Sequence, residues 1–418
     1  HRRSPLSERT RPRARAKTTL ATRLLFRPVM NTYHCSHCGQ TVFFENTRCE
    51  GCGHALAFDP ATMSLLAWQP GPDGTLQPST AALAPEAAQA LQQRAAGGRL
   101  RPCAHHALPH GADAAPAPQG VCNWLSDADD ADGGPLCLSC RCTEVLPALD
   151  RPGNLEAWSR LETAKRRLLH GLLAAGLPIP RRPVDPQGLA FRFLEELPDA
   201  PEPVLTGHDH GLITVSIAEA DDATREARRA AMHEPYRTLL GHFRHEIGHF
   251  YWDQLIAKDE RRLAAFRALF GDERADYGQA LERHYREGAP ADWPQRHISA
   301  YATMHPWEDW AETWAHWMHI SDSLDTASHW GVRLQGDPVA GPAVEPDTAL
   351  AALPGTRDFR RVLVDEWLPL SRFLNSMGRS LGQGDAWPFV VADPVLDRLA
   401  FVHQTVREAA LSRSTPAG

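Results

Sequence analysis

Hydrophobic positions recur with a helical period in three long segments of the chain. The pattern predicts amphipathic helices over residues 155–173, 236–256 and 305–318. In the third segment four tryptophans fall within eleven residues, which predicts that one face of this helix is buried. After residue 236 helical patterns dominate to the C-terminus, interrupted by a Pro- and Gly-rich stretch around 335–356.

Two shorter segments have the composition of β-strands. They are Phe191–Leu194 and Leu212–Ile217, and the residues at 208–211 before the second one are typical of a turn. We expect the two strands to pair in antiparallel fashion. Strands beside many helices, without regular alternation, indicate an α+β fold.

All nine cysteines of the 418-residue chain lie between Cys35 and Cys142. A disulfide framework would not be confined to one third of a chain, whereas metal binding confines cysteines naturally. Two CxxC pairs, each followed by Gly, are separated by ten residues and supply four thiolates to a closed zinc site, as in a zinc ribbon. The predicted ligands of this ribbon are Cys35, Cys38, Cys49 and Cys52.

A second group of cysteines predicts another structural zinc site. It combines one CxxC pair with two single cysteines, which is a weaker pattern, and His105, His106 or His110 could replace one of them. Cys142 is left over, and we expect it to be a packed thiol. The predicted ligands of the second site are Cys103, Cys122, Cys137 and Cys140.

A metal-binding motif of the form HExxH lies within the helix predicted over 236–256. His245 and His249 are one turn apart on one face, so both imidazoles can reach the same ion. A catalytic zinc takes three protein ligands and keeps one position open. Glu246 would then take a proton from zinc-bound water and pass it to the leaving amine.

The tryptophan-rich helix offers the third ligand. Glu308 is the predicted ligand, because buried carboxylates need partners. Glu312, one turn later, would hydrogen-bond a ligating histidine and fix its tautomer. Tyr301 would donate to the oxyanion of a tetrahedral intermediate, or alternatively is only a packed tyrosine. The competing candidates for the third ligand are Asp309, His305, His316 and Glu312 itself.

Charge and composition limit the classes of partner that the protein is expected to bind. The net charge is −7 and the ribbon is not basic, which argues against nucleic-acid binding. No run of about 18 apolar residues occurs, so no membrane partner is expected. A signal-peptide pattern is missing, so we expect a cytoplasmic protein with reduced cysteines. The expected partners are a peptide or protein substrate and a protein docked on the ribbon.

The pattern divides the chain into four parts. Residues 1–29 hold nine Lys or Arg and one acid, which indicates an extension outside the fold or, alternatively, a transit peptide. The zinc ribbon would span 30–69. Residues 70–150 would be a linker rich in Ala, Pro and Gly, with a short helix over 85–97, followed by the second cysteine-rich segment. Residues 151–413 would form the main domain.

Taken together, these motifs resemble a family of bacterial zinc-binding metallopeptidases with an N-terminal zinc-ribbon domain. The resemblance implies a zincin-like, gluzincin-type domain, with one catalytic and one or two structural zinc ions. Cys103 is followed by Ala-His, where the family has Ala-Asn, so His105 competes as a ligand. The resemblance runs from Met30 to about Val406 and rests on both CxxC pairs of the ribbon, Cys122-Asn-Trp124, Cys137-x2-Cys140, Ala164–Leu168, Phe243–His249 and Tyr301–Glu312.

A more local similarity concerns the third ligand. The segment Glu308-Asp-Trp-Ala-Glu312 is similar to a helix of anthrax lethal-factor-like peptidases, in which the first Glu ligates zinc and a tyrosine seven residues upstream assists. These roles map onto Glu308 and Tyr301.

The expected function is zinc-dependent hydrolysis of peptide bonds. Strand 212–217 would lie beside the cleft and hold an extended peptide by strand addition. Three alternatives stay open: a non-catalytic adaptor with a vestigial metal site, a zinc amidase acting on a non-protein amide, and a zinc-ribbon nucleic-acid binder.

Overall fold

The computed structural model describes most of the chain between residues 32 and 414. The described residues are 32–71, 76–107, 121–128, 134–182, 184–196, 204, 206–222, 224–225, 238–334, 358–387 and 391–414. The expectations for residues 1–29 and for His110 lie outside these ranges.

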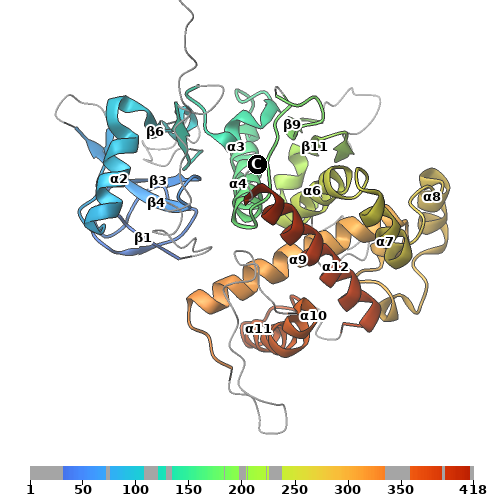
Figure 1. Cartoon of the computed structure of the whole chain (residues 1–418). Helices are drawn as coiled ribbons and strands as arrows, with labels where there is room; N and C mark the ends of the chain where they lie inside the picture. Colours follow the sequence, from blue (N-terminus) through green and yellow to red (C-terminus); the bar gives the residue numbers. More distant parts are fainter. Residues whose placement is uncertain are drawn as a thin grey trace, which may run out of the picture.

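Small antiparallel sheets build the N-terminal module, which is blue in Figure 1. The largest has the order β3-β4-β5, with Phe58 opposite Leu65 in its first pair of strands. Two-stranded sheets join β1 to β2 and β6 to β7. The strands are β1 (Tyr33–His34), β2 (Thr41–Val42), β3 (Ala55–Asp59), β4 (Ser64–Pro70), β5 (Leu76–Pro78), β6 (Leu100–Pro102) and β7 (Leu125–Asp127).

Part of the segment expected to be a linker is folded. The short helix expected over residues 85–97 is confirmed as α2 (Pro85–Ala95), but the segment also contains strands β5 and β6. Leu91 of α2 and Leu100 of β6 are buried against Trp68 of β4. A few large apolar residues among the alanines are therefore enough to fix this segment on the β3-β4-β5 sheet.

A four-stranded mixed sheet begins the second part of the molecule, in the order β10-β11-β9-β8. Strands β8 and β9 are parallel and are joined by the long helix α4 (Asn154–Ala174), which makes a βαβ unit. Its strands are β8 (Thr143–Val145), β9 (Ala190–Leu194), β10 (Gly207–Asp209) and β11 (Leu212–Ser216).

The expected antiparallel pairing of Phe191–Leu194 with Leu212–Ile217 is wrong, because β9 and β11 run parallel. The antiparallel partner of β11 is β10, reached across a tight turn in which His210 has φ 44° and Gly211 has φ 85°. Glycine tolerates this left-handed backbone, and an added Cβ at position 211 would lie 2.5 Å from the Gly188 oxygen. The hairpin uses one side of β11 and leaves the other side for β9.

The position of β11 also corrects the expected place of strand addition. β11 has a hydrogen-bonded strand on both sides, so the segment 212–217 has no free edge for a peptide. In the described part of the sheet the outer strand next to β11 is β10, which lies beside helix α6 (Leu239–Leu255).

Helices form the rest of this part, and the expected α+β class is confirmed. Helix α4 stands between the N-terminal module and the sheet, and α12 crosses α9 (Figure 1). The helices after α6 are α7 (Glu260–Phe270), α8 (Tyr277–Glu287), α9 (Pro306–His329), α10 (Phe359–Val362), a π-helical turn (Leu363–Trp367), α11 (Leu368–Ser380) and α12 (Asp393–Ser414). Short helical segments are α3 (Leu138–Arg141) and the 3₁₀ turns Ala96–Gly98, Ala104–Ala107, Ile217–Ala220, Trp293–Gln295 and Tyr301–Thr303.

Helices α6 and α9 approach each other closely at Gly248. An added Cβ there would lie 3.0 Å from Ala311 Cα and 3.1 Å from Trp314 Cβ. The indole nitrogen of Trp310 donates to the Gly248 carbonyl at 2.9 Å, and both tryptophans are fully buried. Because glycine permits this close packing, the first turns of α9 lie directly over the HExxH face of α6.

The N-terminal module is docked on α4. The Tyr33 hydroxyl and Nε2 of His170 are 2.6 Å apart and share a buried hydrogen bond. Arg167 lies 4.9 Å over the ring of Phe44 and pairs with Glu45. Residues of both parts belong to one continuous hydrophobic core, so the ribbon is fixed to the larger domain.

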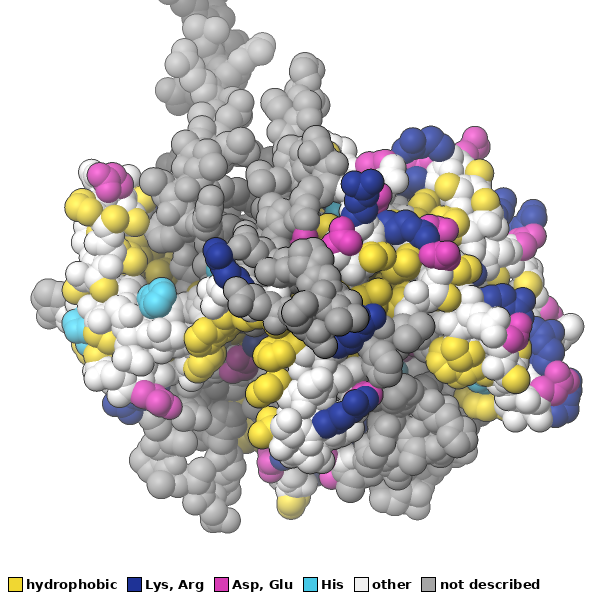
Figure 2. All heavy atoms as spheres, turned by 90° about the horizontal axis from the view of Figure 1, so that it is seen from below, with side chains coloured by type: hydrophobic (Ala, Val, Ile, Leu, Met, Phe, Trp, Pro, Cys, Tyr) yellow, Lys and Arg dark blue, Asp and Glu magenta, His cyan; other side chains and the backbone are white. Residues whose placement is uncertain are grey.

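Charges of both signs are mixed on the surface. On the face shown in Figure 2, Lys and Arg side chains alternate with Asp and Glu on the side of α7 and α8. Ion pairs occur within α8, such as that of Arg286 with Glu282. The described residues of this face therefore form no continuous basic stripe of the kind that binds nucleic acid. Within the described residues, no helix is both long and apolar enough to cross a membrane.

Candidate metal centre

The four cysteines of the ribbon converge on one point. Their sulfur atoms all lie within 4.8 Å of one another, with 3.7 Å between Cys35 and Cys52 and between Cys38 and Cys49. In a tetrahedral site with Zn–S bonds of about 2.3 Å, neighbouring sulfurs are about 3.8 Å apart. The spacing therefore fits a structural zinc ion. Each knuckle ends at a glycine with φ 76°, Gly39 or Gly53.

The second cluster consists of Cys103, Cys122, Cys137 and Cys140, and all four are buried. The sulfurs of Cys122 and Cys137 are 3.6 Å apart, again the edge length of a zinc tetrahedron. The two competing histidines within the described residues, His105 and His106, have other partners. His105 packs edge-on against Trp158 at 5.5 Å, and Nε2 of His106 is 3.1 Å from the Leu56 carbonyl.

Cys142 lies outside both clusters. Its sulfur belongs to neither four-sulfur set, and burial raises the pKa of its thiol to about 12, so the thiol stays protonated. This agrees with the expectation of a packed thiol.

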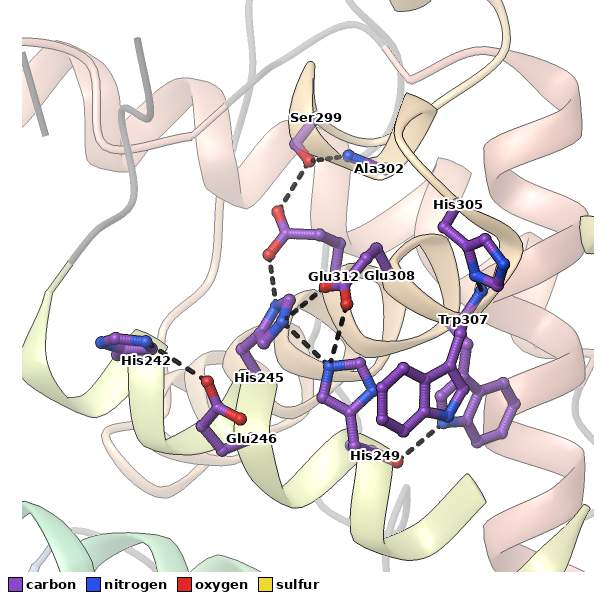
Figure 3. A network of polar contacts seen from close by, with 12 residues as sticks. His242, His245, Glu246, His249, Ser299, Ala302, His305, Trp307, Glu308 and Glu312 are labelled. Atoms are coloured by element: carbon purple, nitrogen blue, oxygen red, sulfur yellow. Dashed lines mark hydrogen bonds and ion pairs between the residues drawn. The ribbon is translucent and has the colours of Figure 1, made fainter. Parts of the chain in front are cut away.

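A third cluster joins α6 to α9 (Figure 3). Nε2 of His245 and Nε2 of His249 are 3.2 Å apart, and the carboxylate of Glu308 lies 2.9 Å from the first and 3.5 Å from the second. The three ligand atoms lie within 4.8 Å of one another. Two imidazoles and one carboxylate are a typical catalytic zinc donor set.

Glu312 fixes the orientation of His245. Its carboxylate accepts a hydrogen bond from Nδ1 of His245 at 2.7 Å and another from the Ser299 hydroxyl at 2.6 Å. The Ala302 amide in turn donates to the Ser299 oxygen at 3.1 Å. With the proton on Nδ1, Nε2 of His245 presents its lone pair to the cluster, as a metal ligand must.

The charges of this cluster compensate one another. Burial disfavours the charged imidazole of His245, but the Glu308 and Glu312 carboxylates outweigh burial and raise its pKa well above the usual value. Burial opposes ionisation of Glu312, yet its bond with His245 lowers its pKa to about 2. The second proton on His245 therefore stands where a metal ion would bind, and metal binding would release it.

Glu246 lies beside the cluster and not within it. Its Oε1 is 3.3 Å from Nε2 of His242, whose Nδ1 is 3.7 Å from the buried carboxylate of Glu219. Burial opposes ionisation of Glu246, but the His242 hydrogen bond and the neighbouring imidazoles keep its pKa below the usual value. The carboxylate is thus ionised and able to accept a proton.

The competing candidates for the third ligand have other roles. His305 caps α9 by accepting from the Trp307 amide at 3.2 Å. Asp309 pairs with Arg398 at 2.9 Å. His316 donates from Nδ1 to the Glu312 carbonyl at 2.8 Å, one turn back along the helix. Tyr301 lies in the 3₁₀ turn before α9, with its ring 6.0 Å from that of His245.

Three residues at this centre escaped the sequence-based prediction. Tyr277 donates its hydroxyl to Oε1 of Glu308 at 2.9 Å. The ring of Trp307 lies 3.8 Å from that of His249, and His208 of β10 lies 6.2 Å from His249 on a nearly parallel plane. Trp307 directly precedes Glu308 in the sequence, and this position is a signal that it lies at the site. Tyr277 and His208 are 31 and 41 residues from Glu308 and His249, and no periodic pattern links them.

Fold and site thus define a metallopeptidase-type helical metal centre behind a module with two four-cysteine clusters. The comparisons with known proteins agree. The family described as "Putative zinc-binding metallo-peptidase" matches residues 154–405, more than half of the chain, and a zinc-ribbon domain family matches residues 32–151. The chain belongs to this zinc-binding metallopeptidase family, as the motifs indicated.

Two mycobacterial proteins are similar to most of the chain. Uncharacterized protein Rv2568c of Mycobacterium tuberculosis (strain H37Rv) and Uncharacterized protein Mb2598c of Mycobacterium bovis are each 42% identical over 382 residues, which cover 91% of this chain and 96% of theirs. No solved structure matches the chain.

Proposed function

We propose that the chain is a zinc-dependent peptidase whose reaction takes place at the α6–α9 cluster. The observation that carries this proposal is the ionised carboxylate of Glu246 next to a convergent set of two imidazoles and one carboxylate. A structural zinc site needs only the ligands, whereas hydrolysis also needs a base beside them.

His245, His249 and Glu308 would hold the ion. Zinc bound there would act as a Lewis acid and lower the pKa of water. Glu246 would accept the water proton and deliver it to the leaving nitrogen. His242, at 3.3 Å, holds one oxygen of Glu246 and leaves the other for this transfer. Tyr301 is the proposed donor to the developing oxyanion.

The substrate we propose is an extended peptide. Strand β10 is the outer strand of the sheet next to α6, and His208 of β10 lies 6.2 Å from His249. A peptide added to β10 would therefore run close to the proposed ligands. The edge of β10 replaces the segment 212–217 in this role.

The decisive experiment compares Glu246→Gln with the wild type. We expect hydrolysis of a peptide-library substrate to fall at least about 1,000-fold, because the amide cannot accept the proton, while zinc content stays the same. Glu282→Gln, on the exposed face of α8, is the matched control and should keep full activity. Wild-type turnover in the Glu246→Gln protein would refute the mechanism.

A further inference from the structure

Helix α8 lies mostly on the surface and reaches the metal centre at two points. Within the helix only Ala280 is buried, and the chain enters it at Asp276, whose carboxylate accepts from the Gln279 amide at 2.9 Å. Two of its side chains reach the centre: Tyr277 at its first turn, and His284, whose ring lies 5.7 Å from that of Tyr301. Of the other residues of α8, Leu281 is half-buried and the rest are exposed.

Tyr277 binds the proposed third ligand directly. Its hydroxyl donates to Oε1 of Glu308 at 2.9 Å, while its ring lies 5.4 Å from that of His305 and 6.2 Å from that of Trp307. Burial and the charge of Glu308 raise the pKa of Tyr277, so the phenol remains a donor at neutral pH. Tyr277 is nevertheless 37% exposed, unlike Glu308 at 2%.

The two oxygens of Glu308 have different surroundings. Oε1 accepts from Tyr277 and lies 3.5 Å from Nε2 of His249, whereas Oε2 lies 2.9 Å from Nε2 of His245. A hydrogen bond to one oxygen of a carboxylate orients the other toward a metal and limits rotation of the group. Glu312 orients His245 in the same way, by a hydrogen bond to the atom that faces away from the cluster. The two orienting bonds come from different helices, from Tyr277 of α8 and from Glu312 of α9.

We propose that Tyr277 is a positioning residue for Glu308, and that this bond fixes α8 to the metal centre so that metal binding and the position of α8 are coupled. The inference rests on the proposed role of Glu308 as a ligand. It requires no particular substrate.

The test is Tyr277→Phe, with Tyr285→Phe as matched control. Tyr285 lies on the same helix and is 64% exposed. Zinc affinity of the third site is measured by competition with a chromophoric chelator, with both cysteine sites filled. We expect zinc to bind about 10- to 100-fold more weakly in Tyr277→Phe and unchanged in Tyr285→Phe.

A second measurement follows α8 itself. Hydrogen exchange of the α8 amides should slow when zinc is added to the wild type and to Tyr285→Phe, but much less in Tyr277→Phe. A zinc dissociation constant within twofold of the wild type, together with wild-type protection of α8, would overturn the inference.

Glu308→Gln separates this inference from the proposed function. If Glu308→Gln loses the third zinc while Tyr277→Phe keeps it, Glu308 is a ligand and only the role of Tyr277 fails. If Glu308→Gln keeps the third zinc at full affinity, the proposed ligand set fails, and the inference fails with it.

Discussion

The bond between Glu312 and His245 makes a quantitative prediction about zinc binding. Glu312→Gln keeps the shape of the side chain and an oxygen that can accept from Nδ1 of His245, but it removes the charge. In the wild type Glu312 accepts two short hydrogen bonds, at 2.7 Å from His245 and 2.6 Å from Ser299. Bonds to a charged group contribute about 1.5–3 kcal/mol each, and the neutral amide retains part of that.

The expected loss follows from these contacts. A less basic His245 that is less firmly oriented should weaken zinc binding about 10- to 100-fold, which corresponds to about 1.4–2.7 kcal/mol. Glu312→Ala should lose more, because Nδ1 of His245 is then buried without a partner.

The assay is chelator competition combined with elemental analysis. The wild type is expected to hold three zinc ions, two in the cysteine clusters and one at the α6–α9 cluster. Glu312→Gln should release only the third at a lower chelator concentration, and exposed Glu282→Gln should behave as the wild type. If Glu312→Gln binds the third zinc within twofold of the wild type, Glu312 does not orient His245.

Three further predictions concern the stability of the fold. Gly248→Ala should lower the free energy of unfolding by about 1–2 kcal/mol in urea titrations, because overpacking at 3.0 Å from Ala311 outweighs the helix propensity of alanine; the exposed helical Gly278→Ala should instead be neutral or stabilising. Tyr33→Phe should lower the free energy of unfolding by about 1–3 kcal/mol, because it leaves the buried His170 without its hydrogen-bond partner. If its effect is smaller than that of the exposed control Tyr285→Phe, this bond does not dock the N-terminal module. In the metal-free protein the pKa of Glu312 is about 2, below its usual 4.5. The ionised carboxylate therefore stabilises the fold fully above pH 4.5, and this contribution is lost as the pH falls toward 2. Unfolding midpoints of Glu312→Gln should depend less on pH in this window than those of the wild type.

Local spacing allowed the three clusters of potential metal ligands to be predicted. Two cysteines in a tight CxxC turn, or two histidines four residues apart on a helix, must point to one place whatever surrounds them. The sequence therefore indicated the donor sets of all three clusters, and the structure brings each set together. Glu308 and Glu312 could be predicted because the tryptophans of α9 show which face of the helix is buried.

Only the tertiary structure decided how distant segments meet. Strand composition could not give the direction of β9 against β11, because that depends on β10, which comes between them in the chain and pairs with β11 as a hairpin. The same arrangement makes β10 the outer strand in place of β11. Tyr277 reaches Glu308 from another helix, and this contact leaves no periodic signal in the sequence. Short-range geometry is encoded residue by residue, whereas these contacts exist only after the whole core has packed.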